Sequence, residues 1–215
     1  IPLYLSHTIV DIDGKRRVQK VTVAKVDEHR KPVPGTEFDI PCDTVLLSVG
    51  LIPENEISKT ADVALDPVTK GPIVDNTMMT QVPGIFACGN VVHVNDLVDN
   101  VSTESEIAGR YAAKFVKYGG AAKTSEIPVK AGSLVRYMVP QSVKAGAVET
   151  PVKLYFRVMN PTQNVTVQAV CGEQTLYSAK KRFVNPGEIE RIEIPPQKLN
   201  GLSQGEIVVS VTKNE

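Results

Sequence analysis

Three cysteines carry the most reactive side chains of this 215-residue sequence, Cys42, Cys88 and Cys171. They lie far apart, and an odd number without a Cys-x-x-Cys pair is typical neither of a disulfide scaffold nor of a dithiol redox motif. Free cysteine is among the residue types most often buried as a small apolar side chain. We therefore interpret all three first as core residues, while the position of Cys88 directly before Gly89 keeps a redox role open for it.

A second group that could do chemistry is His93, Asp96 and Asp99, which follow one another at intervals of three residues. Such a set can mimic a metal site, but this spacing is weak evidence for one outside a predicted helix. We predict no metal here and expect a solvated or ligand-facing loop. In such a loop the imidazole of His93 could serve as a proton donor.

A third feature is the segment Thr80 to Asn90, which reads TQVPGIFACGN. Ile85 to Ala87 is apolar and predicts a short buried strand after a Pro-Gly turn. A polar residue that follows such a strand and a glycine lies at the carboxyl edge of the sheet, where open α/β folds bind ligands. Gly89 would let a ligand approach the backbone, and the amide of Asn90 would bond it. The alternative is that Asn90 is an ordinary turn residue.

The one long helix that the sequence predicts covers Asn100 to Lys117. Apolar side chains recur at helical spacing, acidic residues occupy the early turns, lysines the last turn, and Gly119-Gly120 ends it. The first N–H groups of a helix have no partner inside it and form a positive end. The helix therefore serves either as a ligand-facing element or as a plain structural helix packed through its apolar face.

The remaining elements of the first half are short strands around one buried strand. Asp43 to Gly50 (DTVLLSVG) is almost continuously apolar, which predicts a strand buried on both faces of a parallel sheet. Leu51 to Leu65 has a proline near its start and amphipathic spacing, which predicts a short helix. An antiparallel meander precedes them and a further strand follows, so we expect strands at Thr8 to Ile12, Arg17 to Val26, Glu37 to Ile40 and Gly71 to Val74.

From Ala121 the helical period disappears. Residues 121–127 are mostly small and polar and predict a linker between residues 1–120 and a second domain, 128–215. The second domain holds short apolar runs separated by Pro, Gly and Asn, which predict an all-β immunoglobulin-like sandwich. These runs are Leu134 to Val139, Val152 to Val158, Val165 to Val170, Leu176 to Ala179, Ile189 to Ile194 and Glu206 to Val211.

Two segments of the first half resemble a known family. Cys42 to Ile57 and Val74 to Asn90 are similar to the late segments of the FAD-dependent pyridine nucleotide-disulfide oxidoreductases, among them the NAD(FAD)-dependent dehydrogenases. The family pattern T-x-x-P-G-[IV]-[FY]-A-x-G-[DN] is filled by Thr80, Pro83, Gly84, Ile85, Phe86, Ala87, Gly89 and Asn90. The resemblance covers about residues 1 to 118 and implies a mixed fold: an incomplete α/β part, the end of the NAD- and FAD-binding domains, followed by the β-sandwich.

The resemblance also implies a chemistry and a site. In the intact enzyme, hydride would pass from a nicotinamide cofactor, NAD or NADP, to FAD and on to an acceptor that the sequence does not name. The Asp that usually bonds a ribityl hydroxyl is Asn90 here. Gly89 and Asn90 would face the flavin, and Val101 and Ser102 would lie near its N1/C2=O edge, where a positive helix end suits the charge of the reduced ring. No catalytic residue is assigned within this chain.

The sequence contains no Gly-x-Gly-x-x-Gly, the turn that cradles the phosphates of both dinucleotides in this family. It also opens at Ile1, without methionine, directly in strand-like sequence. We therefore expect a C-terminal fragment of a larger enzyme, which by itself binds neither FAD nor a nicotinamide cofactor and is inactive.

The composition limits the remaining partners. Lys plus Arg and Asp plus Glu number 24 each, so no net field attracts nucleic acid or an anionic membrane surface. No apolar run approaches the roughly 20 residues of a membrane span, and no signal peptide is recognisable, which favours the cytoplasm. The alternative function is non-catalytic: the β-sandwich would dock a partner subunit or form a homo-oligomer.

Overall fold

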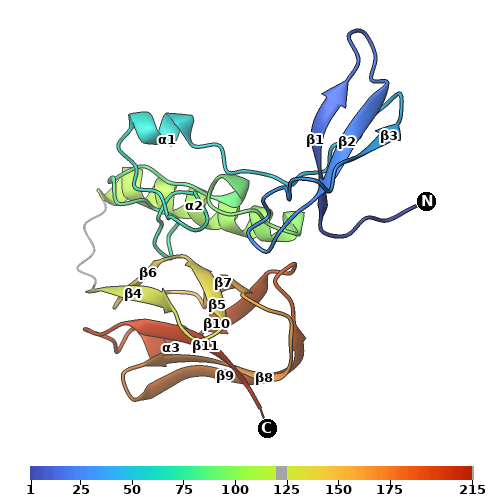
Figure 1. Cartoon of the computed structure of the whole chain (residues 1–215). Coiled ribbons are helices and arrows are strands. Elements are labelled where there is room, and N and C mark those ends of the chain that lie inside the picture. Colours follow the sequence, from blue (N-terminus) through green and yellow to red (C-terminus); the bar gives the residue numbers. More distant parts are fainter. Residues whose placement is uncertain (120–124, 215) are drawn as a thin grey trace. The chain divides into compact units, whose positions relative to one another are not determined.

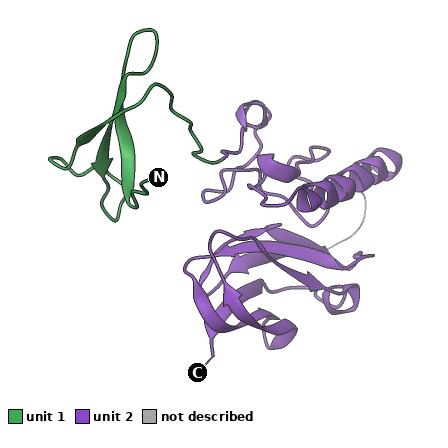
Figure 2. Cartoon of the chain, turned by 90° about the vertical axis from the view of Figure 1, so that its right-hand side faces the viewer, with its two compact units in different colours: residues 1–50 green, residues 51–215 purple. Residues whose placement is uncertain are grey.

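The structure, a computed structural model, describes residues 1–119 and 125–214. The chain forms two compact units, Ile1–Gly50 and Leu51–Glu215 (Figure 2). Within the described residues no helix combines the length and the apolar composition that a membrane span needs. Most of the expected linker at 121–127 lies outside the described residues, and a strand already begins at Ser125.

The first unit is a three-stranded antiparallel sheet (Figure 1) of β1 (His7–Asp13), β2 (Lys20–Lys25) and β3 (Phe38–Pro41), with β2 in the centre. Alternation along β2 buries Val21 and Val23 on one face, as expected of a half-buried strand. The outer strand β1 is exposed along most of its length. The predicted meander is therefore confirmed.

The segment Asp43 to Gly50 is not the buried strand that its apolar run predicts. It has no regular secondary structure, and Leu46 and Val49 are 91% and 89% exposed. A strand of a parallel sheet needs neighbours on both sides and helices on both faces. No strand of the described residues pairs with this segment, so its apolar side chains are not buried in a sheet.

The second unit begins with an irregular stretch that carries α1 (Glu56–Thr60), the 3-10 turn η1 (Gly89–Val91) and α2 (Val98–Tyr118). The predicted long helix is confirmed as α2, which starts two residues earlier and ends one residue later than expected. Gly119 ends it in the left-handed conformation, with φ 70°. The helix expected over Leu51 to Leu65 is confined to the five residues of α1.

The strands expected at Gly71 to Val74 and Ile85 to Ala87 do not form. Instead, isolated bridges join this stretch, among them Leu65 to Pro72, Val74 to Thr80 and Met79 to Phe86. Between them the carboxylate of Asp75 accepts the N–H groups of Thr77 and Met79 at 2.7 and 3.3 Å. Such side-chain to backbone bonds use N–H groups that would otherwise pair with a neighbouring strand, and they hold this segment as a series of turns.

The rest of the second unit consists of two sheets that share one core. Phe156, Leu154 and Ile192 from one sheet pack with Val167 and Val209 from the other. The three-stranded sheet has the order β10 (Glu190–Ile194), β7 (Val152–Val158), β5 (Val135–Val139). The five-stranded sheet has the order β6 (Ser142–Ala145), β4 (Ser125–Ala131), β11 (Ile207–Lys213), β8 (Thr162–Cys171), β9 (Gln174–Val184).

All strand neighbours in these sheets are antiparallel except β4 and β11, which are parallel, and a short helix, α3 (Pro196–Leu199), precedes β11. Each of the six predicted apolar runs falls within one of these strands, apart from single residues at the ends. The strands β4 and β6 were not expected. The all-β character of this part is confirmed, while its immunoglobulin-like type stays a prediction.

A second core joins the sheets to residues 51–119. It combines apolar side chains of the irregular stretch and α2 with two residues of β5: Val74, Met78, Val92, Ala108, Tyr137 and Val139. The backbone of Gln141 donates to the carbonyl of Val74 at 2.9 Å, and its side chain accepts the N–H of Val74 at 3.0 Å. The division into domains 1–120 and 128–215 stays a prediction, but α2 packs against the sheets within one unit.

Candidate functional site

The turn η1 after the TQVPGIFACGN segment is built around Gly89. Gly89 is buried and has φ 71°, a left-handed conformation that favours glycine. A Cβ at this position would lie 3.0 Å from Cγ1 of Val101. The absence of a side chain therefore lets α2 approach the turn, and the side chain of Val101 occupies the space that we expected a ligand to use.

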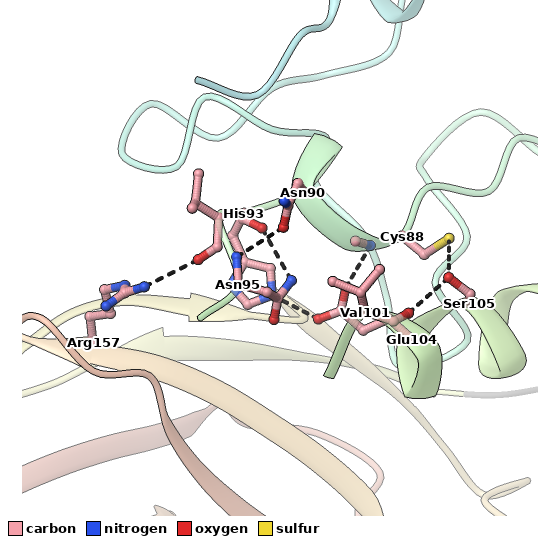
Figure 3. Close-up of polar contacts among 10 residues, drawn as sticks. Cys88, Asn90, His93, Asn95, Val101, Glu104, Ser105 and Arg157 are labelled. Atoms are coloured by element: carbon pink, nitrogen blue, oxygen red, sulfur yellow. Dashed lines mark hydrogen bonds and ion pairs between the residues drawn. The ribbon is translucent and has the colours of Figure 1, made fainter. Parts of the chain in front are cut away.

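Glu104 fixes this turn to α2 from inside the molecule. One carboxylate oxygen accepts the N–H of Gly89 at 2.7 Å, and the other is hydrogen-bonded to Nε2 of His93 at 2.7 Å (Figure 3). The side chains of His93 and Glu104 are each 1% exposed. Because Glu104 takes the Gly89 N–H, that group is not free for a ligand.

His93 faces the core, contrary to the expected solvated or ligand-facing loop. Its ring lies 6.0 Å from that of Tyr137 and 5.9 Å from that of Tyr155, measured between centroids. Burial raises the pKa of both tyrosines, because the charged phenolate is poorly solvated there. The expectation failed because Glu104, one element further along the chain, supplies the polar partner that lets a histidine be buried.

Asn55, which precedes α1, also holds the turn η1, and the sequence patterns did not single it out. Its Nδ2 donates to the carbonyls of Lys70 and Val91 at 3.0 and 3.1 Å, and its Oδ1 accepts the hydroxyl of Ser58 at 2.9 Å. The residue is only 4% exposed. The feature of the sequence that could have pointed to Asn55 is its position directly before the short helix α1, where Asn is a common capping residue.

Asn90 lies on the outer side of the turn. It is exposed, and its Oδ1 accepts the backbone N–H of Asn95 at 3.0 Å (Figure 3). This bond orients the amide, so that the NH2 group is the part left to act as a donor. Asn90 thus shapes a turn and carries an exposed NH2 group, while its contact with a ligand stays a prediction.

The beginning of α2 differs in detail from the expectation. Since the helix starts at Val98, its unpartnered N–H groups belong to the first residues of the helix rather than to Val101 and Ser102. Leu97 at the N-cap makes no capping bond with its side chain. Val101 packs on Gly89, while Ser102 is exposed one residue further along. The four predicted site residues are therefore neighbours, but two face inward and two face outward.

The other chemically interesting side chains are separated from one another. Asp96 pairs with Arg157 rather than with His93, and within the described residues no group of three or more His, Cys, Asp or Glu is arranged to hold a metal. Cys88 is partly buried, and its thiol lies 3.6 Å from the hydroxyl of Ser105. Cys171 is buried, as expected of a core residue.

A cavity of about 30 Å³ lies between α2 and the sheets. Glu104, Ile107 and Tyr111 of α2 and Tyr155 of β7 are among the residues that line it. This volume suffices for one or two water molecules and is far below that of a cofactor pocket.

Comparison with known proteins identifies a family and two relatives. A sequence model of the pyridine nucleotide-disulphide oxidoreductase family matches residues 1–112. The chain is similar to the NADP(+)-dependent formate dehydrogenase subunit beta of Moorella thermoacetica, with 40% identity over 68 residues, 28% of this chain and 8% of that protein.

The chain is also similar to the nitric oxide reductase FlRd-NAD(+) reductase of Salmonella heidelberg (strain SL476). The two are 26% identical over 155 residues, which are 66% of this chain and 40% of that protein. The chain thus spans less than half the length of these relatives, at 8% and 40%.

Proposed function

We propose a function from one premise: the chain belongs to the pyridine nucleotide-disulphide oxidoreductase family, whose model matches residues 1–112. In the whole protein, electrons would pass from a nicotinamide cofactor through FAD to an acceptor. The names of both relatives include NAD(+) or NADP(+), which supports a nicotinamide donor. FAD would supply the hydride chemistry when bound, and this chain would bind and orient it.

The exposed amide of Asn90 is the observation that supports this function best. Its carbonyl is occupied by Asn95, so its NH2 group can donate to an oxygen of a ribityl chain or pyrophosphate. The start of α2, without a side-chain cap, follows a few residues later and offers positive N–H groups to the same ligand. These donors fit a flavin nucleotide.

The four predicted site residues would have two different roles, cofactor contact and shaping of the site. Asn90 and Ser102 would contact the cofactor, because both are exposed. Gly89 and Val101 would set the shape of the wall by packing against each other. Glu104 and Asn55 would keep that wall rigid, since both are buried and hold the turn from opposite ends.

The test replaces Asn90 by alanine in the whole protein and measures the dissociation constant of FAD by titration of the apoprotein. We expect about tenfold weaker binding, which corresponds to one lost hydrogen bond of about 1.4 kcal/mol. The replacement Asn90→Asp should retain binding, because a carboxylate still accepts the Asn95 N–H and can bond a hydroxyl. The control is Asn160→Ala, at an exposed loop position. Unchanged FAD affinity in Asn90→Ala would contradict the proposed site.

The chain of residues 1–215 by itself should bind no flavin. It supplies one wall of the site and lacks a Gly-x-Gly-x-x-Gly turn for either dinucleotide. Purification of this chain followed by a visible absorption spectrum tests the point. A stoichiometric oxidised-flavin band would overturn it.

A second function is docking by the β sheets, in a partner complex or a homo-oligomer. The supporting observation is β9, an 11-residue strand at the edge of the five-stranded sheet, where Phe183 is 45% exposed. Light scattering on Phe183→Lys and on the unaltered protein tests it. A lower mass for the variant supports self-association, and identical monomeric masses contradict it.

A further inference from the structure

Arg157 of β7 reaches from the sheets to the loop that precedes α2. Its Nη2 donates to the carbonyl of Val94 at 3.2 Å (Figure 3). The same Nη2 pairs with Oδ1 of Asp96, and Nη1 donates to the carbonyl of Pro186 at 3.1 Å. The second oxygen of Asp96 accepts the N–H of Ile189 at 2.6 Å. The loop is thus held by β7 and by the segment before β10.

The residue held between these contacts is Asn95, whose neighbours Val94 and Asp96 both bond to Arg157. The N–H of Asn95 donates to Oδ1 of Asn90, and its side chain donates to the carbonyl of His93 at 3.3 Å. A continuous series of hydrogen bonds therefore leads from the guanidinium in the sheet to the amide at the candidate site. If the loop moves, the acceptor side of Asn90 loses its fixed donor.

The Arg157 to Asp96 pair is suited to hold the loop in one position. The side chain of Arg157 is 14% exposed and that of Asp96 is 34% exposed, so solvent screens the pair less than a surface pair. Desolvation is the largest single influence and lowers the pKa of Arg157, but the hydrogen bonds and charges of Asp96 and Tyr137 together outweigh it and raise that pKa. The guanidinium remains charged, and its planar donors match several acceptors at once.

We propose that Arg157 is a positioning residue of the flavin site. It acts from the β sheets on the loop 93–97 and so orients the amide of Asn90 toward the cofactor. This inference rests on the proposed function, in which Asn90 contacts FAD. It makes the sheets a part of the cofactor site rather than a separate docking module alone.

The experiment is a double-mutant cycle in the whole protein, with FAD affinity as the measured quantity. We expect Arg157→Gln to weaken FAD binding by about tenfold, equivalent to about 1.4 kcal/mol. In the Asn90→Ala background the same change should have little further effect, because its action passes through Asn90. The control is Arg136→Gln, an exposed arginine on the neighbouring strand β5, which should bind FAD as the unaltered protein does.

The variant Asp96→Asn serves where Arg157→Gln does not fold. It keeps the size of the side chain but removes the charge that pairs with Arg157, and it should weaken FAD binding in the same non-additive way. Full FAD affinity in the variant that folds, or losses that add fully to those of Asn90→Ala, would overturn the role of Arg157. Unchanged affinity in Asn90→Ala itself would instead overturn the proposed function.

Discussion

At the scale of single residues, Glu104 connects three parts of the site with one buried carboxylate. Replacing it by alanine leaves the N–H of Gly89 and Nε2 of His93 without their acceptors inside the molecule. Unsatisfied buried groups of this kind cost about 1–3 kcal/mol each, so we expect Glu104→Ala to lower the free energy of unfolding by about 2–5 kcal/mol. Urea unfolding followed by circular dichroism measures this.

The neighbour Glu106 provides the control, because it lies exposed on the same helix. Its replacement by alanine should change stability by less than about 0.5 kcal/mol. Equal, small effects of both replacements would mean that the carboxylate of Glu104 does not hold the turn.

Because Tyr155 is buried, we expect the stability of the protein to fall at alkaline pH. Its hydroxyl is buried without a hydrogen-bond partner in the described parts of the chain, and burial raises its pKa above the ordinary value of about 10. Above a pH of about 10 the tyrosine of the unfolded chain loses its proton before the buried Tyr155 of the folded chain does. The free energy of unfolding that protonated Tyr155 contributes below this pH is therefore lost as the pH rises through the raised pKa. We expect Tyr155→Phe to unfold at a higher alkaline pH than the unaltered protein.

At neutral pH the same variant should be about as stable as the unaltered protein, since no bond to another described residue is removed. Tyr118→Phe, at an exposed position, should leave the alkaline midpoint where it is. Alkaline titrations monitored by circular dichroism compare the three proteins, and an unshifted midpoint in Tyr155→Phe would contradict the argument.

At the scale of elements, two glycines predict opposite effects of the same replacement. Gly109 lies within α2 and a Cβ there meets nothing within 4 Å, so Gly109→Ala should stabilise the protein by about 0.5–1 kcal/mol. At Gly71 a Cβ would lie 1.8 Å from the carbonyl oxygen of Val92, and we expect Gly71→Ala to destabilise by about 1–3 kcal/mol. Thermal unfolding of both variants checks the signs, and a stabilising Gly71→Ala would contradict the packing of that loop on η1.

The elements also show how far sequence patterns reach. The helix α2, the strands of the meander and the strands of the sheets other than β4 and β6 were predictable, because each carries its own period and its own end signals, such as Gly119 for α2. Asp43 to Gly50 was not, because a buried parallel strand is defined by neighbours that its own residues do not specify.

The candidate site likewise contains residues that the sequence identified and residues that it did not. Gly89 and Asn90 were found by a local motif, and they lie together on η1. The partners that hold them, Asn55, Glu104 and Arg157, come from positions up to 67 residues away in sequence, from Asn90 to Arg157. Contacts over that distance follow from the packing of elements, which no local pattern contains.

At the scale of the whole molecule, the shared core predicts that residues 51–118 cannot fold without the sheets. Tyr137 and Val139 of β5 complete the apolar cluster around Val74, Val92 and Ala108. Without them the apolar face of α2 and the irregular stretch would be open to water, and burial of that face is the main stabilising contribution available to so short a segment.

We therefore expect residues 51–215 to unfold in one cooperative transition and residues 51–118 to show none. Calorimetry and near-ultraviolet circular dichroism of the two chains provide the measurement, and Val139→Ala in residues 51–215 should lower the transition temperature because it opens a cavity at the junction. If residues 51–118 alone unfolded cooperatively, the sheets would be an independent addition, and removing them would leave the turn at Gly89 intact. If they do not, loss of flavin on deleting the sheets reports lost folding, and only point replacements such as Arg157→Gln can separate positioning from folding.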